Sequence, residues 1–340
     1  MALLWMEGFD QYDLGISLIP SGKYFYRAGG YPIIVASPGV GAFSSQCMWC
    51  DDDDDVFAAF PAPATTHTII FGCGYYQMYT VTTCSLLSFY GDDISTRWAY
   101  LEHFDGTLKW VVQGGATHII ANNLIVQSTW YYLEVKVTLS TGPANLELRI
   151  DGNTVFNDVL PSTVAAGVAD PIVKTIRLAD TDTRNMYLDD IYVCDDSGAI
   201  NNDFLGKVSV VVLKPNNTGS FSDFTPVGAA NNWDCVNNAG RNASETTYVT
   251  STTPGHKDLY AFEDLPSQYT DVKAVSINGS AKAVGDGGQT LKYVIGSQSS
   301  SRNLPLVYDD TLQVIKETSD GTNAWTPAAV NSVEAGFEVE

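Results

Sequence analysis

The sequence predicts an all-β protein with two domains: a β-sandwich followed by a second, smaller β-sandwich domain. Short runs rich in Val, Ile, Tyr, Thr and Trp recur between Gly, Asn, Asp and Pro, and hardly any segment has the period of a helix. The length of 340 residues exceeds what one small sandwich needs. Only 17% of the residues are charged, and 29 glycines are available for turns. We therefore expect a sandwich at residues 1–198, a linker at 199–206 and the smaller domain at 207–340.

The clearest strands of the first half lie between Trp130 and Phe156. Apolar and polar residues alternate over Tyr131–Leu139, which predicts a strand with one buried face and with Glu134 and Lys136 on the solvent face. Residues 146–150 alternate in the same way, and the following Asp-Gly-Asn at 151–153 is a hairpin signal. Further strands are expected at Thr68–Phe71, Leu86–Phe89, Ala99–Phe104, Leu108–Gln113, Ile172–Leu178 and Tyr187–Val193.

The second half begins with an apolar run, Lys207–Lys214, that predicts a strand. A stretch rich in Asn, Gly, Ser and Thr follows at Pro215–Pro254, and a loop of that length is usually functional, mobile or ordered by a partner. Further strands are expected at Asp258–Phe262, Val272–Ala283, Thr290–Ile295 and Leu312–Glu317.

One helix is expected near the end of the chain. Thr326 is a suitable N-cap, Pro327 fits the first helical position, and Ala328–Ala335 continue the helix. Gly336 fits the C-terminal cap, and 337–339 are expected to close a sheet.

The charge and the N-terminal residues limit the classes of partner. The formal net charge of −21 repels nucleic acid phosphates and anionic membrane surfaces, so neither is an expected partner. Residues 1–7 lack the basic and apolar regions of a secretory signal, and no run is long enough to span a membrane as a helix. We expect a protein that is made in the cytosol without an export signal.

The cysteines predict neither a redox centre nor a zinc site. Cys47 and Cys50 have CxxC spacing, but no helix start and no second ligand pair accompany them. The aspartates at 51–55 would raise the thiol pKa values and so lower their reactivity. We interpret all six cysteines as buried or incidental thiols.

No residue is predicted to be catalytic, cofactor-binding or metal-ligating. The best acidic candidate is Glu147-Leu148-Arg149-Ile150-Asp151, in which the central Arg149 would pair with both acids and keep them ionised. The sequence contains no GxSxG nucleophile elbow, no HExxH zinc-protease motif and no phosphate-binding P-loop. The scattered histidines fit no ligand spacing and are interpreted as surface or strand residues: His67, His103, His118 and His256.

Calcium and glycans are the two ligands that the sequence neither predicts nor excludes. Hard oxygen ligands for calcium occur at Asp51–Asp55, at Asp180 and Asp182, and at Asp189–Asp190, although adjacent like charges more often form an exposed turn. Aromatic platforms for a sugar are Trp98, Trp110, Trp233 and Tyr90, although tryptophan on alternating strands is more often core. Glycosylation patterns at Asn216, Asn242 and Asn278 are interpreted as chance matches, because no export signal precedes them.

Three motifs of the first half resemble the concanavalin A-like (laminin G-like) jelly roll. They are the opening Glu7-Gly8-Phe9-Asp10, the strand at 130–134 with the later hairpin ending in Asp151-Gly152, and the closing strand 187–193 with its Asp189-Asp190 pair. The resemblance covers roughly residues 1–200 and implies a sandwich fold. It does not imply an activity, because this fold serves lectins, glucanases and structural modules.

The second half is similar to the C-terminal part of virion structural proteins of tailed phages. The order of Asn202–Gly206, Lys257–Pro266 and Ala324–Val339 carries this resemblance. It implies a structural component of a phage particle, of the capsid decoration, head fibre or tail-associated kind. Such a protein would reside in the virion, bind capsid or tail subunits, and form a homo-oligomer such as a trimer.

Two other functions remain open at this point. The first is a carbohydrate-binding module for host recognition, on a tail fibre or head fibre, which saturable binding to host polysaccharide would favour. The second is a polysaccharide-degrading enzyme, which reducing-sugar release lost on Glu147→Gln would favour. The non-catalytic structural protein is the leading prediction.

Overall fold

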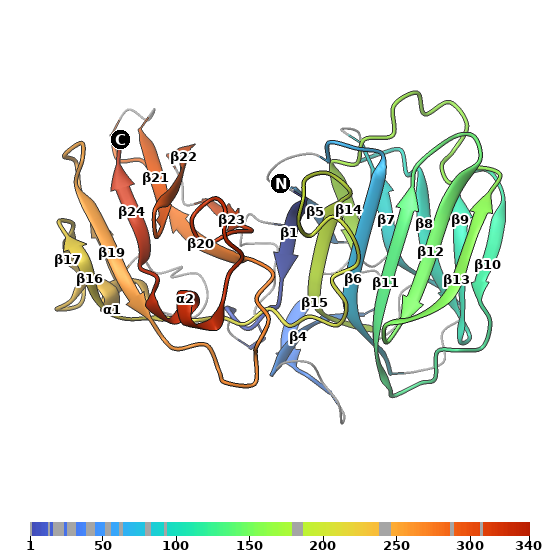
Figure 1. The fold of residues 1–340 in the computed structure, drawn as a ribbon, viewed down its shortest axis with the longest axis horizontal. Coiled ribbons are helices and arrows are strands. Elements are labelled where there is room, and N and C mark those ends of the chain that lie inside the picture. Colours follow the sequence, from blue (N-terminus) through green and yellow to red (C-terminus); the bar gives the residue numbers. More distant parts are fainter. Residues whose placement is uncertain are drawn as a thin grey trace. The chain divides into compact units, whose positions relative to one another are not determined.

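The computed structural model divides the chain into two compact units, Met1–Val210 and Val211–Glu340 (Figure 1). The expected linker at 199–206 lies inside the first unit. The residues described are 2–12, 14–15, 24–25, 32–38, 45–51, 56–60, 64–78, 83–91, 94–178, 186–237, 246–285, 289–306 and 309–340.

The first unit is a sandwich of two antiparallel sheets, as expected from the sequence. The larger sheet has the order β13-β12-β11-β6-β15-β4-β3, and β1 also pairs with β15. Its strands are β1 (Leu3–Glu7), β3 (Ile33–Ala36), β4 (Gln46–Cys50), β6 (Thr68–Gln77), β11 (Trp130–Thr138), β12 (Ala144–Ile150), β13 (Asn153–Leu160) and β15 (Met186–Asp195).

The smaller sheet of the sandwich has the order β10-β9-β8-β7-β14-β5-β2. Its strands are β2 (Tyr24–Phe25), β5 (Val56–Ala59), β7 (Cys84–Tyr90), β8 (Ala99–Phe104), β9 (Thr107–Val112), β10 (Thr117–Ala121) and β14 (Thr175–Leu178).

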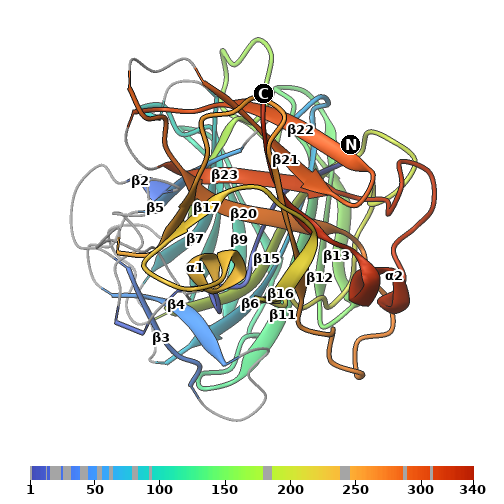
Figure 2. The ribbon, with the colours of Figure 1, turned by 90° about the vertical axis from the view of Figure 1, so that its left-hand side faces the viewer.

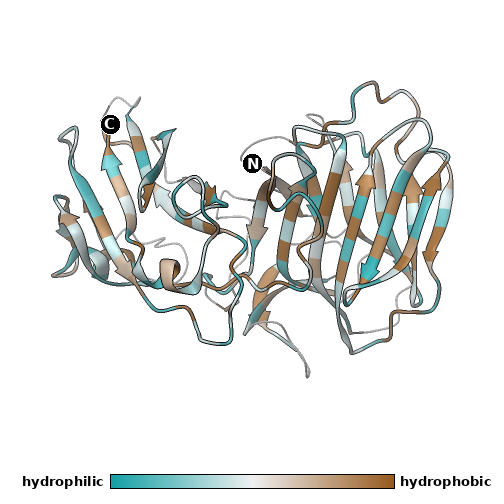
Figure 3. Cartoon of the chain, viewed as in Figure 1, coloured by the Kyte–Doolittle hydropathy of each residue, from teal (hydrophilic) through white to brown (hydrophobic). Residues whose placement is uncertain are grey.

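Alternate residues of both sheets fill the core between them. Leu133, Val135 and Val137 of β11 lie in this core, together with Leu146 and Leu148 of β12. The alternation of apolar and polar residues along such strands is visible in Figure 3. Burial of these side chains supplies the main driving force for the sandwich, at roughly 1.5–3 kcal/mol for each large apolar side chain.

The second unit is built on a five-stranded antiparallel sheet with the order β16-β19-β24-β21-β22. Two strand pairs, β17-β18 and β20-β23, accompany it. The strands are β16 (Pro215–Ser222), β17 (Thr225–Val227), β18 (Tyr248–Thr250), β19 (Lys257–Phe262), β20 (Val275–Ala281), β21 (Thr290–Ile295), β22 (Gln298–Asn303), β23 (Asp309–Lys316) and β24 (Ala335–Val339). Helix α1 (Asn232–Val236) lies beside β16 and β17 (Figure 2), and α2 (Pro327–Ser332) precedes β24.

Two predictions about the start of the second half are wrong. The run Lys207–Lys214 forms no strand, because side chains take up backbone N–H groups that a sheet would otherwise bond. Val210 donates to Asp190, and Lys214 donates to Glu263. The region Pro215–Pro254 is no single loop, since it contains β16, β17, α1 and β18 in its described part.

The helix prediction is confirmed at its start and wrong at its end. The Thr326 hydroxyl accepts the N–H of Ala329, and Pro327 is the first helical residue. The helix ends at Ser332, with Val333 as its C-cap. Gly336 belongs to β24 instead, where a Cβ would lie 2.0 Å from the Asp258 carbonyl oxygen of β19. That glycine therefore allows two strands to approach.

Candidate functional site

The candidate site lies on the outer face of the larger sheet, which points away from the core. Leu133 and Val135 of β11 face the core, so Glu134 and Lys136 lie on this outer face. The expectation that Glu134 faces solvent is wrong, because it and Tyr132 are both 0% exposed. A segment distant in sequence covers them.

That segment is residues 203–210, here called the strap. The Gly206 N–H donates to Glu134 Oε1 at 2.9 Å, and the Leu205 N–H donates to the Tyr192 hydroxyl at 3.1 Å. The Tyr192 hydroxyl donates to Glu134 Oε1 at 2.5 Å. Burial, and then the Glu134 charge, raise the pKa of Tyr192 well above its ordinary value, so it remains a donor. Two backbone amides of the strap are therefore held by one Tyr–Glu pair.

The strap is also attached at a β-bulge in β15. The register of β15 against β6 shifts between Asp189 and Tyr192, and both Asp189 and Asp190 are 0% exposed. Asp190 has a φ of +46°, a conformation that Asp tolerates better than most residues. Its Oδ1 accepts the Val210 N–H at 2.6 Å. Burial raises the pKa of Asp190 to about 7, and the neighbouring Asp10 adds to this effect.

Two further contacts of the strap are made by side chains. Asp203 Oδ1 lies 3.0 Å from Lys136 Nζ, and the Phe204 ring centroid lies 3.9 Å from the Arg149 guanidinium carbon. Phe204 and Arg149 are both half-buried. Such exposed or half-exposed contacts contribute little stability individually.

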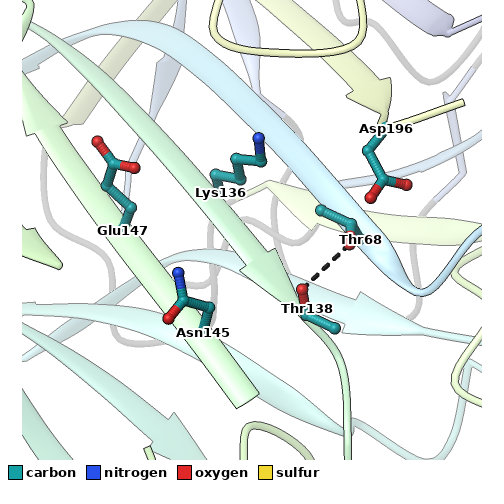
Figure 4. Close-up of a pocket in the computed structure, with 6 residues that line it drawn as sticks. All are labelled: Thr68, Lys136, Thr138, Asn145, Glu147 and Asp196. Atoms are coloured by element: carbon teal, nitrogen blue, oxygen red, sulfur yellow. Dashed lines mark hydrogen bonds between the residues drawn. The ribbon is translucent and has the colours of Figure 1, made fainter. Parts of the chain in front are cut away.

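A polar pocket of about 160 Å³ adjoins the strap on the same face. Strands β6, β11 and β12 contribute to its lining, as does the turn after β15, through Thr68, Lys136, Thr138, Asn145, Glu147 and Asp196 (Figure 4). The hydroxyls of Thr68 and Thr138 lie 3.1 Å apart. Lys136 both lines the pocket and binds the strap, so the two features are continuous. Sequence analysis did not identify this pocket, because its residues come from strands far apart in the chain.

The acidic candidate on β12 is held in an ion pair. Arg149 Nε lies 2.8 Å from Glu147 Oε1, and the Thr154 hydroxyl donates to the same oxygen at 3.0 Å. Asp151 lies at the hairpin turn, where its Oδ1 accepts the Tyr132 N–H at 2.9 Å. Both carboxylates therefore accept hydrogen bonds or an ion pair from neighbouring groups of the sandwich.

The buried histidine, His103, is a structural group of the sandwich core. The Gly106 N–H donates to His103 Nε2 at 2.9 Å, so Nδ1 carries the proton and faces the Tyr75 hydroxyl at 2.9 Å. That hydroxyl in turn donates to Gln77 at 2.7 Å. Burial lowers the pKa of His103 to about 4, which keeps the ring neutral. His67, by contrast, is exposed and lies 2.7 Å from Asp170.

The cysteines are buried and free, as predicted. Burial raises the pKa of Cys47 to about 12, with smaller contributions from Asp189 and Asp10. Cys73 shifts in the same direction, chiefly because of burial. Both thiols are therefore protonated at neutral pH, and a protonated thiol is a poor nucleophile.

Asp189 and Asp190, two of the calcium candidates, accept hydrogen bonds from backbone N–H groups. Asp189 Oδ1 accepts the Asp190 N–H, and Asp190 Oδ1 accepts from the strap. Over the described ranges, no group of three or more His, Cys, Asp or Glu side chains is arranged to hold a metal ion. Residues 52–55, 180 and 182 lie outside the described residues.

The predicted aromatic platforms do not gather on one surface. Trp110 and Tyr90 are buried, Trp98 packs against the core of the sandwich, and Trp233 lies in α1 of the second unit. The outer face carries a different aromatic group, which sequence analysis did not single out: Tyr76, Trp130 and Tyr187, packed with Cys47. The Trp130 indole donates to the Pro38 carbonyl at 2.7 Å.

The three glycosylation patterns fall in different places. Asn216 lies on β16 and Asn278 on β20, both exposed, and Asn242 lies outside the described residues. In the part of the chain that the structure describes, no helix has both the length and the hydropathy needed to cross a membrane.

Comparison with known proteins found solved structures that are similar at low sequence identity. No family model matches the chain, and no curated protein matches it. Domain 4 of the arabinanase AbnA from Geobacillus stearothermophilus, solved with arabinotriose, is 12% identical, with a TM-score of 0.40 over 57% of this chain and 92% of that one. The catalytic domain of a family 131 glycoside hydrolase from Coprinopsis cinerea is 13% identical, with a TM-score of 0.39 over 60% and 98%.

The carbohydrate-binding module CBM66 from Bacillus subtilis is a further similar structure. It is 10% identical, with a TM-score of 0.33 over 52% of this chain and 97% of that one. These likenesses concern the sandwich fold alone.

Proposed function

We propose that this chain is a non-catalytic structural protein of a tailed-phage particle, which docks on capsid or tail subunits through the surfaces of its two units. The observation that carries the non-catalytic part is the role of the motif carboxylates. Glu7 Oε1 accepts hydrogen bonds from the N–H groups of Gly8 and Phe9. Asp151 accepts one from the Tyr132 N–H, and Asp190 accepts one from the Val210 N–H of the strap. These carboxylates position backbone and have a scaffolding role.

The particle part of the proposal rests on the resemblance of the second half to virion proteins. The matching segments occupy the strap, strand β19 and the α2–β24 region. The net charge of −21 fits a protein that meets basic surfaces of neighbouring subunits. A homo-oligomer, in particular a trimer, is the proposed assembly, because such proteins lie on symmetry axes.

Quantitative mass spectrometry on gradient-purified particles tests this proposal. We expect peptides of this chain at a fixed ratio to the major capsid protein, also after a high-salt wash. Absence of the chain from washed particles that retain their capsid and tail proteins would refute the particle role.

A carbohydrate-binding role is the second candidate, and the polar pocket favours it. The pocket combines a lysine, an amide, paired hydroxyls and carboxylates, which are groups that hydrogen-bond to sugar hydroxyls. Its volume of about 160 Å³ is below the 300–1,000 Å³ of pockets for larger ligands, so the ligand proposed for it is as small as one sugar unit of a surface polysaccharide.

Binding of host polysaccharide to the purified chain tests this candidate. Asn145→Ala removes one amide from the pocket and is expected to weaken binding about 2- to 13-fold, the effect of one hydrogen bond of 0.5–1.5 kcal/mol. Asn278→Ala, at an exposed position on β20, is the control. Equal affinity of both variants and the native chain would exclude the pocket.

A further inference from the structure

The strap belongs to the longest stretch without a buried side chain among the described residues. From residue 196 to residue 223, no side chain is buried, although every residue in this stretch is described. The strap itself, residues 203–210, has no regular secondary structure. Segments with few buried apolar contacts open locally at low free-energy cost, while the elements beneath them stay folded.

The groups beneath the strap are buried and incompletely bonded. Glu134 and Asp190 are each 0% exposed. In the described structure, Glu134 Oε2 and Asp190 Oδ2 have no hydrogen-bond partner. A buried carboxylate oxygen without a partner costs free energy that hydration would recover.

When the strap opens, the hydrogen bonds that it loses to the sheet are partly compensated by new hydrogen bonds to water. Opening breaks the bonds from the amides of Leu205, Gly206 and Val210 to the sheet. It also lets water reach both unpartnered carboxylate oxygens. The released N–H groups can then donate to water instead of to the sheet. The core of the sandwich is not disturbed, because it lies on the other face of the sheet.

We propose that residues 203–210 form a releasable latch on the larger sheet, which opens while the sandwich stays folded. In the closed state the strap covers Glu134, Tyr192 and Asp190. In the open state Lys136 is freed from Asp203, and the polar pocket extends along β11 over these covered groups. The latch thus controls how much of the outer face is accessible to solvent.

Hydrogen exchange on the full chain measures the latch directly. We expect the amides of Leu205, Gly206 and Val210 to exchange at least about tenfold faster than the amides of β6 and β11. Their exchange should also depend little on low concentrations of urea, because local opening exposes little surface. Equal protection and equal urea dependence of the strap and sheet amides would overturn the proposal.

A pair of matched variants separates the latch from general destabilisation. Asp203→Ala removes the ion pair with Lys136, in which the side chains are 31% and 65% exposed for Lys and Asp. Asp271→Ala removes the ion pair with Lys273 in the second unit, with exposures of 38% for Lys and 71% for Asp. Asp203→Ala should speed strap exchange about 1.4- to 5-fold, the effect of a surface ion pair, and Asp271→Ala should leave it unchanged. No acceleration by Asp203→Ala, or the same acceleration by both, would contradict the latch.

Native-state proteolysis gives a second measurement. Trypsin cleavage after the exposed Lys207 requires the strap to leave the sheet. We expect two fragments under native conditions, with a cleavage rate that Asp203→Ala raises by the factor found in hydrogen exchange. Resistance of this bond until the whole first unit unfolds would overturn the proposal.

Discussion

Replacement of Tyr192 by phenylalanine should weaken the first unit through one hydroxyl. The Tyr192 side chain is 1% exposed, and its hydroxyl donates to Glu134 at 2.5 Å while accepting from Leu205 at 3.1 Å. Phenylalanine leaves no cavity, so the effect comes from hydrogen bonding alone. Loss of a buried hydrogen bond to a charged group costs roughly 1.5–3 kcal/mol. The second bond adds little, because Leu205 lies on the surface strap. We therefore expect a loss of about 2–3 kcal/mol in the free energy of unfolding.

The assay is urea unfolding of the full chain, monitored by tryptophan fluorescence, to which the buried Trp5, Trp110 and Trp130 of the first unit contribute. The control is Tyr131→Phe, whose hydroxyl accepts only the exposed Val126 N–H, at 3.1 Å. It should change the free energy of unfolding by less than about 0.5 kcal/mol. If Tyr192→Phe and Tyr131→Phe have the same small effect, the buried Tyr–Glu pair does not hold the strap as argued.

Three further predictions follow from other contacts. Gly72→Ala should destabilise the first unit by about 1–3 kcal/mol, because the added Cβ would lie 2.1 Å from the Tyr192 ring. Gly142→Ala is the control for thermal unfolding and should have no such effect, because the nearest atom to its Cβ would be 3.8 Å away. The folded-state pKa of Asp190 is raised to about 7. The free energy of unfolding of the native chain, relative to that of Asp190→Asn, should therefore be highest below pH 4 and fall until about pH 7, by at most about 1.4 kcal/mol per pH unit. A difference that rises with pH would refute this reasoning. Thr326→Ala should cost the second unit about 1 kcal/mol and Thr326→Ser much less, as measured by urea unfolding; equal losses would exclude the N-cap bond.

The sequence was sufficient to predict structure where local patterns decide it. The alternation over Tyr131–Leu139 predicted β11, and Asp151-Gly152 predicted the hairpin between β12 and β13, where both residues have positive φ. Thr326 and Pro327 predicted the start of α2. In each case the deciding interactions are made by neighbours in the chain.

Features that depend on contacts between residues far apart in the chain, or on polar strands, could not be predicted from local sequence patterns. Glu134 alternates like a solvent-facing residue, and only the strap, more than sixty residues later, buries it. Strand β16 is an exposed edge strand of polar residues, so it has no apolar period to detect. The pocket joins Thr68 to Asn145, which sequence spacing does not relate.

A reconstruction of the intact phage particle is the decisive test of the structural role. We expect density for both β units at symmetry-related positions on the capsid or tail, in contact with neighbouring subunits. Particles whose density is fully explained by other proteins, together with release of reducing sugar by the purified chain, would contradict a non-catalytic structural role.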